Sequence, residues 1–138
     1  MPVIGNKIND VIVKFSPAVN REVDQHMIEG LRRVIRGDIA EGQVLNEIYI
    51  SSANDQHELP SRHVQGGGKA VDISRINGMK MSVYYPTDKS VQAIVSAIQM
   101  AFELYPLRRE NFGPAFKKKL GAVSQVSGHR DHIHLSVN

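Results

Sequence analysis

Apolar residues recur at three- and four-residue spacing in two stretches of the chain, which is the pattern of amphipathic helices. The first stretch begins after Asn20, a candidate N-cap, ends at Gly37, and carries the apolar residues Val23, Met27, Leu31, Val34 and Ile35. The second begins at a cap, Thr87 or Asp88, ends before Pro106, and carries Val91, Ile94, Val95, Ile98, Phe102 and Tyr105. We therefore expect two main helices, each with one face packed on a core.

Strand-like sequence lies outside these two helices. Alternating and β-branched residues predict strands over residues 11–15 and 45–52. The Asn-Gly pair at 77–78 is a strong two-residue turn signal, and it predicts a hairpin that pairs residues 69–76 with residues 79–85.

The last third of the chain is less regular until its final ten residues. Residues 107–120 are basic and are interrupted by Gly113-Pro114, so we expect an irregular segment there, followed by a short strand over residues 123–126. Helices and strands come in blocks rather than in strict alternation. We expect a single α+β domain over residues 1–138, with a mostly antiparallel sheet packed against the two helices.

Three of the six histidines lie within six residues, at positions 129, 132 and 134. In a strand that ends at Val137, one face would present His132, His134 and Ser136, and the other would present Ile133, Leu135 and Val137. Two imidazoles on one face, with Asp131 at the start of the strand, are more typical of a metal site than of a solvated edge. Zinc usually takes three or four protein ligands, so the remaining ligands must come from elsewhere. Because the chain has no cysteine, they must be histidine or carboxylate.

A second cluster of candidate ligands follows a long polar loop, residues 53–68. Loops of this length within a compact domain are usually functional or disordered. Asp72 lies between Val71 and Ile73, and a carboxylate in such an apolar setting needs a partner, which a metal ion can provide. The glycines at 66–68 would let the backbone turn sharply, so that His63 returns alongside Asp72.

The two clusters resemble the motifs of the zinc D-Ala-D-Ala carboxypeptidase, dipeptidase and L-alanyl-D-glutamate endopeptidase family, which includes phage endolysins and has a hedgehog-like α+β fold. The family's first motif reads Ser-x-His-x-x-Gly-x-Ala-x-Asp, and its second is a terminal Asp/Glu-x-x-His. The matching residues are Ser61, His63, Gly66, Ala70 and Asp72 in the first cluster, and His129, Asp131, His132 and His134 in the second. The resemblance covers residues 48–72 and 128–137.

The resemblance implies a role for each matching residue. One Zn²⁺ ion would be bound by His63, Asp72 and His134, with His57 as the substitute for His63. Asp131 would be the catalytic carboxylate, or would fix an imidazole through its second nitrogen. His132 and His129 would stabilise the oxyanion. Ser61 and its neighbour Arg62 would contact the substrate.

Two departures from the family pattern bear on the substrate. The interval from His63 to Asp72 is two residues longer than usual, and the extra residues fall in the glycine run. The family also has an arginine that binds a substrate carboxylate, and the acidic residue Asp55 stands at about that place here. Either Arg62 or Arg75 would take over this role, or no free carboxylate is bound. The second case favours an endopeptidase over a carboxypeptidase.

The resemblance predicts hydrolysis of peptidoglycan stem peptides or muropeptides by a monomeric zinc enzyme. Two alternatives remain: a non-catalytic zinc module of the same fold, and a metal-dependent nuclease suggested by the basic residues Arg108, Arg109, Lys117, Lys118 and Lys119. The formal charge of +3 fits attraction to an anionic polymer without requiring one, and we expect no nucleic-acid partner.

No apolar run approaches the roughly 20 residues that span a bilayer, and the first ten residues lack the features of a secretory signal. We therefore expect synthesis in the cytoplasm without membrane insertion. A phage lysin released to the cell wall, a tail-associated enzyme or a bacterial recycling enzyme would each fit.

Overall fold

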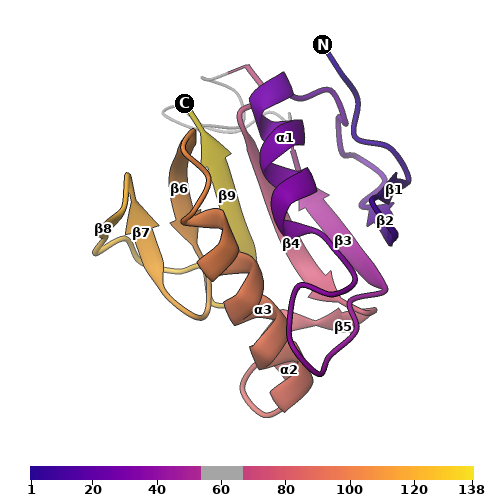
Figure 1. Ribbon diagram of the computed structural model, residues 1–138, viewed down its shortest axis with the longest axis vertical. Helices are drawn as coiled ribbons and strands as arrows, with labels where there is room; N and C mark the ends of the chain where they lie inside the picture. The colour runs from indigo at the N-terminus through magenta and orange to yellow at the C-terminus, as the bar shows by residue number, and fades with distance from the viewer. Residues whose placement is uncertain (54–66) are drawn as a thin grey trace.

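The computed structural model describes residues 1–53 and 67–138. Within these residues the chain forms an α+β domain with a mostly antiparallel sheet, as the sequence predicted (Figure 1). The strands, in chain order, are β1 (Lys7–Ile8), β2 (Val11–Phe15), β3 (Glu47–Ser52), β4 (Ala70–Ile76), β5 (Met79–Lys80), β6 (Arg108–Phe112), β7 (Lys117–Lys119), β8 (Ala122–Val123) and β9 (Ile133–Val137). The helices are α1 (Gln25–Val34), α2 (Met81–Tyr84) and α3 (Lys89–Phe102).

The spatial order of the strands is β1-β2-β3-β4-β9-β6-β7-β8, with β5 paired to the end of β4. Only β2 and β3 run parallel; the other pairs among the described strands are antiparallel. The C-terminal strand β9 therefore lies in the middle of the sheet, between β4 and β6 (Figure 1).

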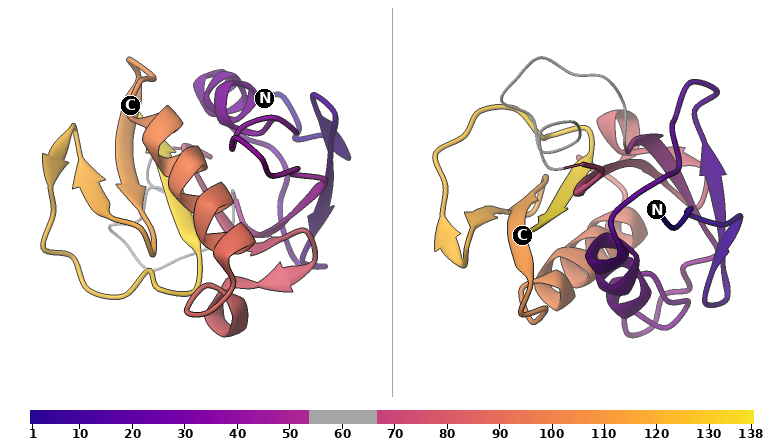
Figure 2. Two further views of the ribbon diagram at one scale, coloured as in Figure 1. Left: turned by 60° about the horizontal axis from the view of Figure 1, so that its bottom comes forward. Right: turned by 90° about the horizontal axis from the view of Figure 1, so that it is seen from above.

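Helices α1 and α3 cover the same face of the sheet (Figure 2). The apolar stripes predicted for both helices are buried against that face, together with Ile133, Leu135 and Val137 of β9, which are fully buried. The alternation predicted for β9 is therefore present, and it turns His134 and Ser136 to the face of the sheet away from the two helices.

The predicted helix boundaries are largely confirmed. Asp88 caps α3, and its side chain accepts a hydrogen bond from the backbone N–H of Val91. Helix α1, however, is capped by Asp24 rather than Asn20. The Asn20 side chain accepts from the N–H of Glu22 and so forms a local turn before the helix.

The predicted hairpin after Asn77-Gly78 is wrong beyond its first two residues. Strand β5 pairs with Arg75 and Ile76 only, and the chain then turns into the short helix α2. The reason is the position of β9, which pairs with residues 70–73 along the same edge of β4. A longer hairpin would have to displace β9.

The expectation of an irregular segment over residues 107–120 is also wrong, because β6 and β7 form there. These residues lack apolar alternation, and the backbone pairing of β6 with β9 and β7 supplies their hydrogen bonds. The short strand predicted over residues 123–126 overlaps the observed β8 only at Val123. Within the described residues, no helix is both long and apolar enough to cross a membrane.

Candidate metal centre

Three neighbouring strands bring the candidate ligands together on the sheet face opposite the helices. In the antiparallel register, His134 of β9 lies across from Asp72 of β4 on one side and from Phe112 of β6 on the other. Cross-strand neighbours of this kind have their side chains on the same face. The pairing of β4 with β9 therefore joins the two sequence clusters.

The imidazole of His134 lies between two carboxylates. Its Nδ1 is 2.8 Å from Oδ1 of Asp72, and its Nε2 is 3.0 Å from Oε1 of Glu110. All three side chains are largely buried, with exposed fractions of 12% for His134, 16% for Asp72 and 18% for Glu110. The ring of Phe112 stacks on the imidazole, with the ring centroids 5.7 Å apart.

These contacts determine the charge of His134 in the protein without metal. Burial alone would lower the pKa of His134, but the hydrogen bonds and charges of Asp72 and Glu110 outweigh it and raise the pKa to about 9. Burial likewise opposes ionisation of Glu110, yet hydrogen bonds from His134 and Ser136 lower the pKa of Glu110 to about 2. At neutral pH His134 is therefore an imidazolium that donates Nδ1–H to Asp72 and Nε2–H to Glu110.

Asp131 and His132 lie just before β9, which begins at Ile133. Asp131 Oδ1 is 2.7 Å from Nδ1 of His132, while Nε2 of His132 is 3.9 Å from Oδ1 of Asp72. The His132 ring therefore connects the exposed carboxylate of Asp131 to the carboxylate of Asp72. This geometry matches the alternative role of Asp131, in which it fixes an imidazole.

His129 completes a group of three imidazoles. Its ring centroid lies 5.0 Å from that of His132 and 5.7 Å from that of His134, and its ring also contacts Phe112. Burial, together with the nearby charges of His132 and His134, lowers the pKa of His129. The rings of His129, His132 and His134 therefore form one cluster beside Phe112.

Asp72 and His134 are of the right chemical type to bind zinc, since carboxylate oxygen and imidazole nitrogen are common zinc ligands. Two tetrahedral ligand atoms at about 2.0–2.1 Å from zinc lie roughly 3.3 Å apart, so the 2.8 Å contact would have to open only slightly. Within residues 1–53 and 67–138, no group of three or more histidine or acidic side chains is arranged to hold a metal ion. Of the three predicted ligands, Asp72 and His134 are in contact with each other.

The other predicted residues of the first motif cannot be placed. His63, its substitute His57, and the predicted substrate contacts Ser61 and Arg62 lie outside the described residues. Arg75, the alternative to Arg62, packs its guanidinium over the ring of Tyr49 at 4.2 Å. Arg75, on β4, therefore packs against a side chain of the neighbouring strand β3.

Sequence reasoning missed Glu110 and Phe112, because no periodic signal marks residues 108–112 as a strand. The signal that did exist was Ser136, predicted to share the face of His134. Ser136 is fully buried; its hydroxyl donates to Oε1 of Glu110 at 2.9 Å and accepts from the Glu110 N–H at 2.9 Å. A buried hydroxyl beside a candidate ligand indicated a polar partner on the neighbouring strand.

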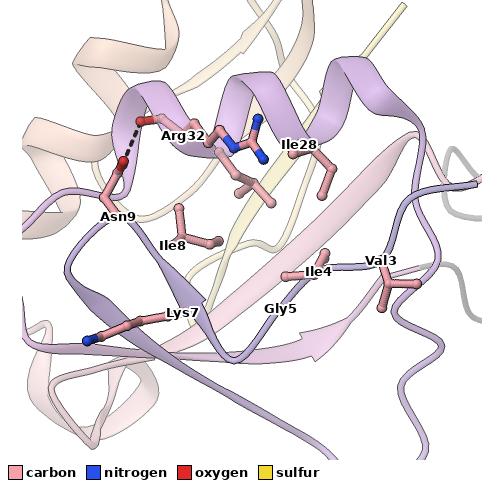
Figure 3. Close-up of a pocket in the computed structure, with 9 residues that line it drawn as sticks. Val3, Ile4, Gly5, Lys7, Ile8, Asn9, Ile28 and Arg32 are labelled. Atoms are coloured by element: carbon pink, nitrogen blue, oxygen red, sulfur yellow. Dashed lines mark hydrogen bonds between the residues drawn. The ribbon is translucent and has the colours of Figure 1, made fainter.

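A separate cavity of about 240 Å³ lies between the N-terminal segment and α1 (Figure 3). Asn9 closes one end by donating hydrogen bonds to the carbonyl oxygens of Arg32 and Ile35 at the end of α1. The lining residues are Val3, Ile4, Gly5, Lys7, Ile8, Asn9, Ile28, Leu31 and Arg32. None of them belongs to the group around His134.

No protein-family model, curated protein or solved structure matches this chain.

Proposed function

We propose that this chain is a zinc-dependent peptidase that hydrolyses peptidoglycan stem peptides. The observation that carries the proposal is the 2.8 Å contact between Asp72 and His134. These residues are 62 positions apart in the sequence, and each is the last residue of a motif that resembles one of the family's two motifs. Their meeting in space is what a shared metal ion requires.

In this proposal Asp72, through Oδ1, and His134, through Nδ1, would hold the ion, with His63 as the third protein ligand. A zinc ion with an open coordination position acts as a Lewis acid and lowers the pKa of water to roughly 7. The remaining residues then have to move protons and stabilise charge at the peptide carbonyl.

We assign proton transfer to the Asp131–His132 pair. Asp131 holds Nδ1 of His132, so Nε2 faces Asp72 and the region where the ion and substrate would meet. A carboxylate that orients an imidazole in this way fixes its tautomer and its ring orientation. His129 packs against the rings of His132 and His134, and in its protonated form it would donate a hydrogen bond to the oxyanion.

The nuclease alternative has less support, because several of the basic side chains that suggested it have partners within the chain. Arg108 pairs with Glu103 at 3.3 Å, Lys117 donates to the carbonyl oxygen of Val126, and Lys118 lies over the ring of Phe116. These contacts direct the side chains toward packing within the chain.

The deciding experiment is mass spectrometry of muropeptides after digestion of purified cell walls, with and without a chelator. We expect new peptide termini with zinc and none with the chelator, and the mass of the products identifies an endopeptidase or a carboxypeptidase. His134→Ala should lose both zinc and cleavage. Asp131→Ala should keep zinc and lose about 10²- to 10⁴-fold in rate, the usual contribution of acid–base catalysis.

His26→Ala is a matched control, because His26 lies at the start of α1, half exposed beside Asp24. It should cleave at the parental rate. Zinc binding by the parent without any cleavage would reject the peptidase and favour the non-catalytic zinc module.

A further inference from the structure

The Nε2 nitrogen of His134 contacts Glu110, a residue to which the proposed function assigns no role. Nδ1 faces Asp72, whereas Nε2 contacts Glu110 of β6 on the other side of the ring. Strands β4, β9 and β6 lie side by side, with β9 in the middle (Figure 1). The carboxylates of Asp72 and Glu110 therefore approach the imidazole from opposite directions.

This arrangement separates the roles of the two carboxylates. The two nitrogens of an imidazole point away from each other, so a single ion bound at Nδ1 beside Asp72 lies out of reach of the Glu110 oxygen that contacts Nε2. Glu110 is therefore placed as a hydrogen-bond acceptor for His134 and not as a ligand of the same ion. Metal-binding histidines commonly donate their other N–H to a carboxylate, which fixes the tautomer and the ring orientation.

We propose that Glu110 is a positioning residue for the metal centre: it accepts the Nε2–H of His134 and so keeps Nδ1 as the nitrogen that binds zinc. This inference rests on the zinc site of the proposed function. It assigns a role to a residue that neither of the two sequence motifs contains.

Glu110 is itself held in place by Ser136. The Ser136 hydroxyl donates to Oε1 of Glu110, the oxygen that contacts His134, and accepts from the Glu110 backbone N–H. The pairing of β6 with β9 shifts register between Arg108 and Asn111, which frees that N–H from the ladder. Irregularities of this kind redirect side chains next to functional sites.

The stacked ring of Phe112 restricts the imidazole further. Phe112 is 5% exposed and lies nearly parallel to the His134 ring, at an interplanar angle of 15°. The ring of His134 is therefore held by Glu110 at its edge and by Phe112 on its face before any ion arrives. Ligands held in this way lose little conformational freedom on binding.

The test is the zinc dissociation constant, measured by competition with a chelating dye. Glu110→Ala should weaken zinc binding about 10- to 100-fold, the usual effect of removing such a partner. Glu110→Gln keeps an oxygen that can accept the Nε2–H, so it should lose less than Glu110→Ala.

Glu103→Gln is the matched control. Glu103 also contacts β6 and is similarly buried, at 16% exposed, but it accepts from Asn111 and Arg108 on the helix side of the sheet. It should bind zinc within about twofold of the parent. Far-UV circular dichroism and the melting temperature of each metal-free variant separate a lost positioning contact from a lost fold.

A second readout is the tautomer of His134 in the zinc-loaded parent, from long-range ¹H–¹⁵N correlation NMR. We expect a protonated Nε2 and a metal-bound Nδ1. A metal-bound Nε2, or a folded Glu110→Ala protein with the parental dissociation constant, would overturn the inference and leave the peptidase proposal standing. A parent that binds zinc but cleaves no wall peptide would reject the peptidase and leave the role of Glu110 intact.

Discussion

At the scale of single residues, the two carboxylates around His134 make the stability of the metal-free protein depend on pH. Their contacts raise the pKa of His134 from 6.5 to about 9. A raised pKa means that the folded state binds the proton more tightly than the unfolded state does. The stabilisation is therefore fully present below pH 6.5 and is lost as the pH rises through 9.

We predict that the free energy of unfolding falls between pH 6.5 and pH 9.5 when zinc is removed by a chelator. A shift of this size corresponds to at most about 3.5 kcal/mol, because each pKa unit is worth about 1.4 kcal/mol. Urea denaturation at several pH values measures the loss. In His134→Gln the decline should be much smaller, and equal declines in both proteins would contradict the assignment.

At the scale of elements, a buried polar network joins α3 to β6 and so sets the position of Glu110. The fully buried Gln99 of α3 donates to the side-chain oxygen of Asn111 and to the carbonyl oxygen of Phe116, and accepts from the N–H of Ala115. Asn111 donates back to the carbonyl oxygen of Gln99. Asn111 faces the helices while its neighbour Glu110 faces His134, so one strand serves both layers.

We predict that Gln99→Leu destabilises the protein by roughly 2–4 kcal/mol, because it leaves several buried donors and acceptors without partners. Gln92→Leu on the same helix is the control. Gln92 is partly exposed and makes one hydrogen bond, to the carbonyl oxygen of Tyr85, so its loss should cost about 1 kcal/mol or less. Urea midpoints of the two variants give the comparison, and similar values would argue against the network.

The contrast between these elements explains what could be predicted from the sequence. Helices α1 and α3 and strand β9 carry a clear period and recognisable caps or turns, so local sequence determines them. Strand β6 reads Arg-Arg-Glu-Asn-Phe and has no such period. Its polar side chains instead form hydrogen bonds with residues of α3 and β9. The hairpin was overextended for a related reason: its turn is local, but its length is limited by a strand that lies 57 residues further along the chain, from Ile76 to Ile133.

The candidate site divides in the same way. Asp72 and His134 were predicted to bind one ion, because the family resemblance implies it and because Asp72 interrupts an apolar strand while His134 lies on the polar face of an alternating one; the structure brings the two side chains into contact. Glu110 was not predicted, since its contact with His134 depends on which strand lies beside β9, and that is a property of the topology.

At the scale of the whole molecule, one sheet separates the core from the candidate metal centre. The residues of β9 alternate between the helix-covered face and the face with His134, so the apolar core and the candidate metal centre lie on opposite faces of the sheet. Binding of a metal ion to the folded state alone should therefore appear as a simple increase in stability.

We predict that zinc at 100 times its dissociation constant stabilises the protein by about 2.7 kcal/mol and raises its melting temperature by roughly 10 °C. Differential scanning fluorimetry at pH 7.5 measures the shift. Magnesium, which prefers oxygen ligands in octahedral geometry, should give little shift, as should zinc added to His134→Ala. A shift of the same size in His134→Ala would place the zinc site elsewhere.

The central place of β9 has a consequence for the newborn polypeptide. Among the described strands, β4 and β6 touch no common partner except β9, so the sheet is two separate halves until residues 133–137 insert between them. During translation Asp72 belongs to one half and Glu110 to the other, and the histidine that bridges them is made last of the three. The candidate metal centre therefore cannot form until β9 has been made, and a copy truncated before β9 would lack it.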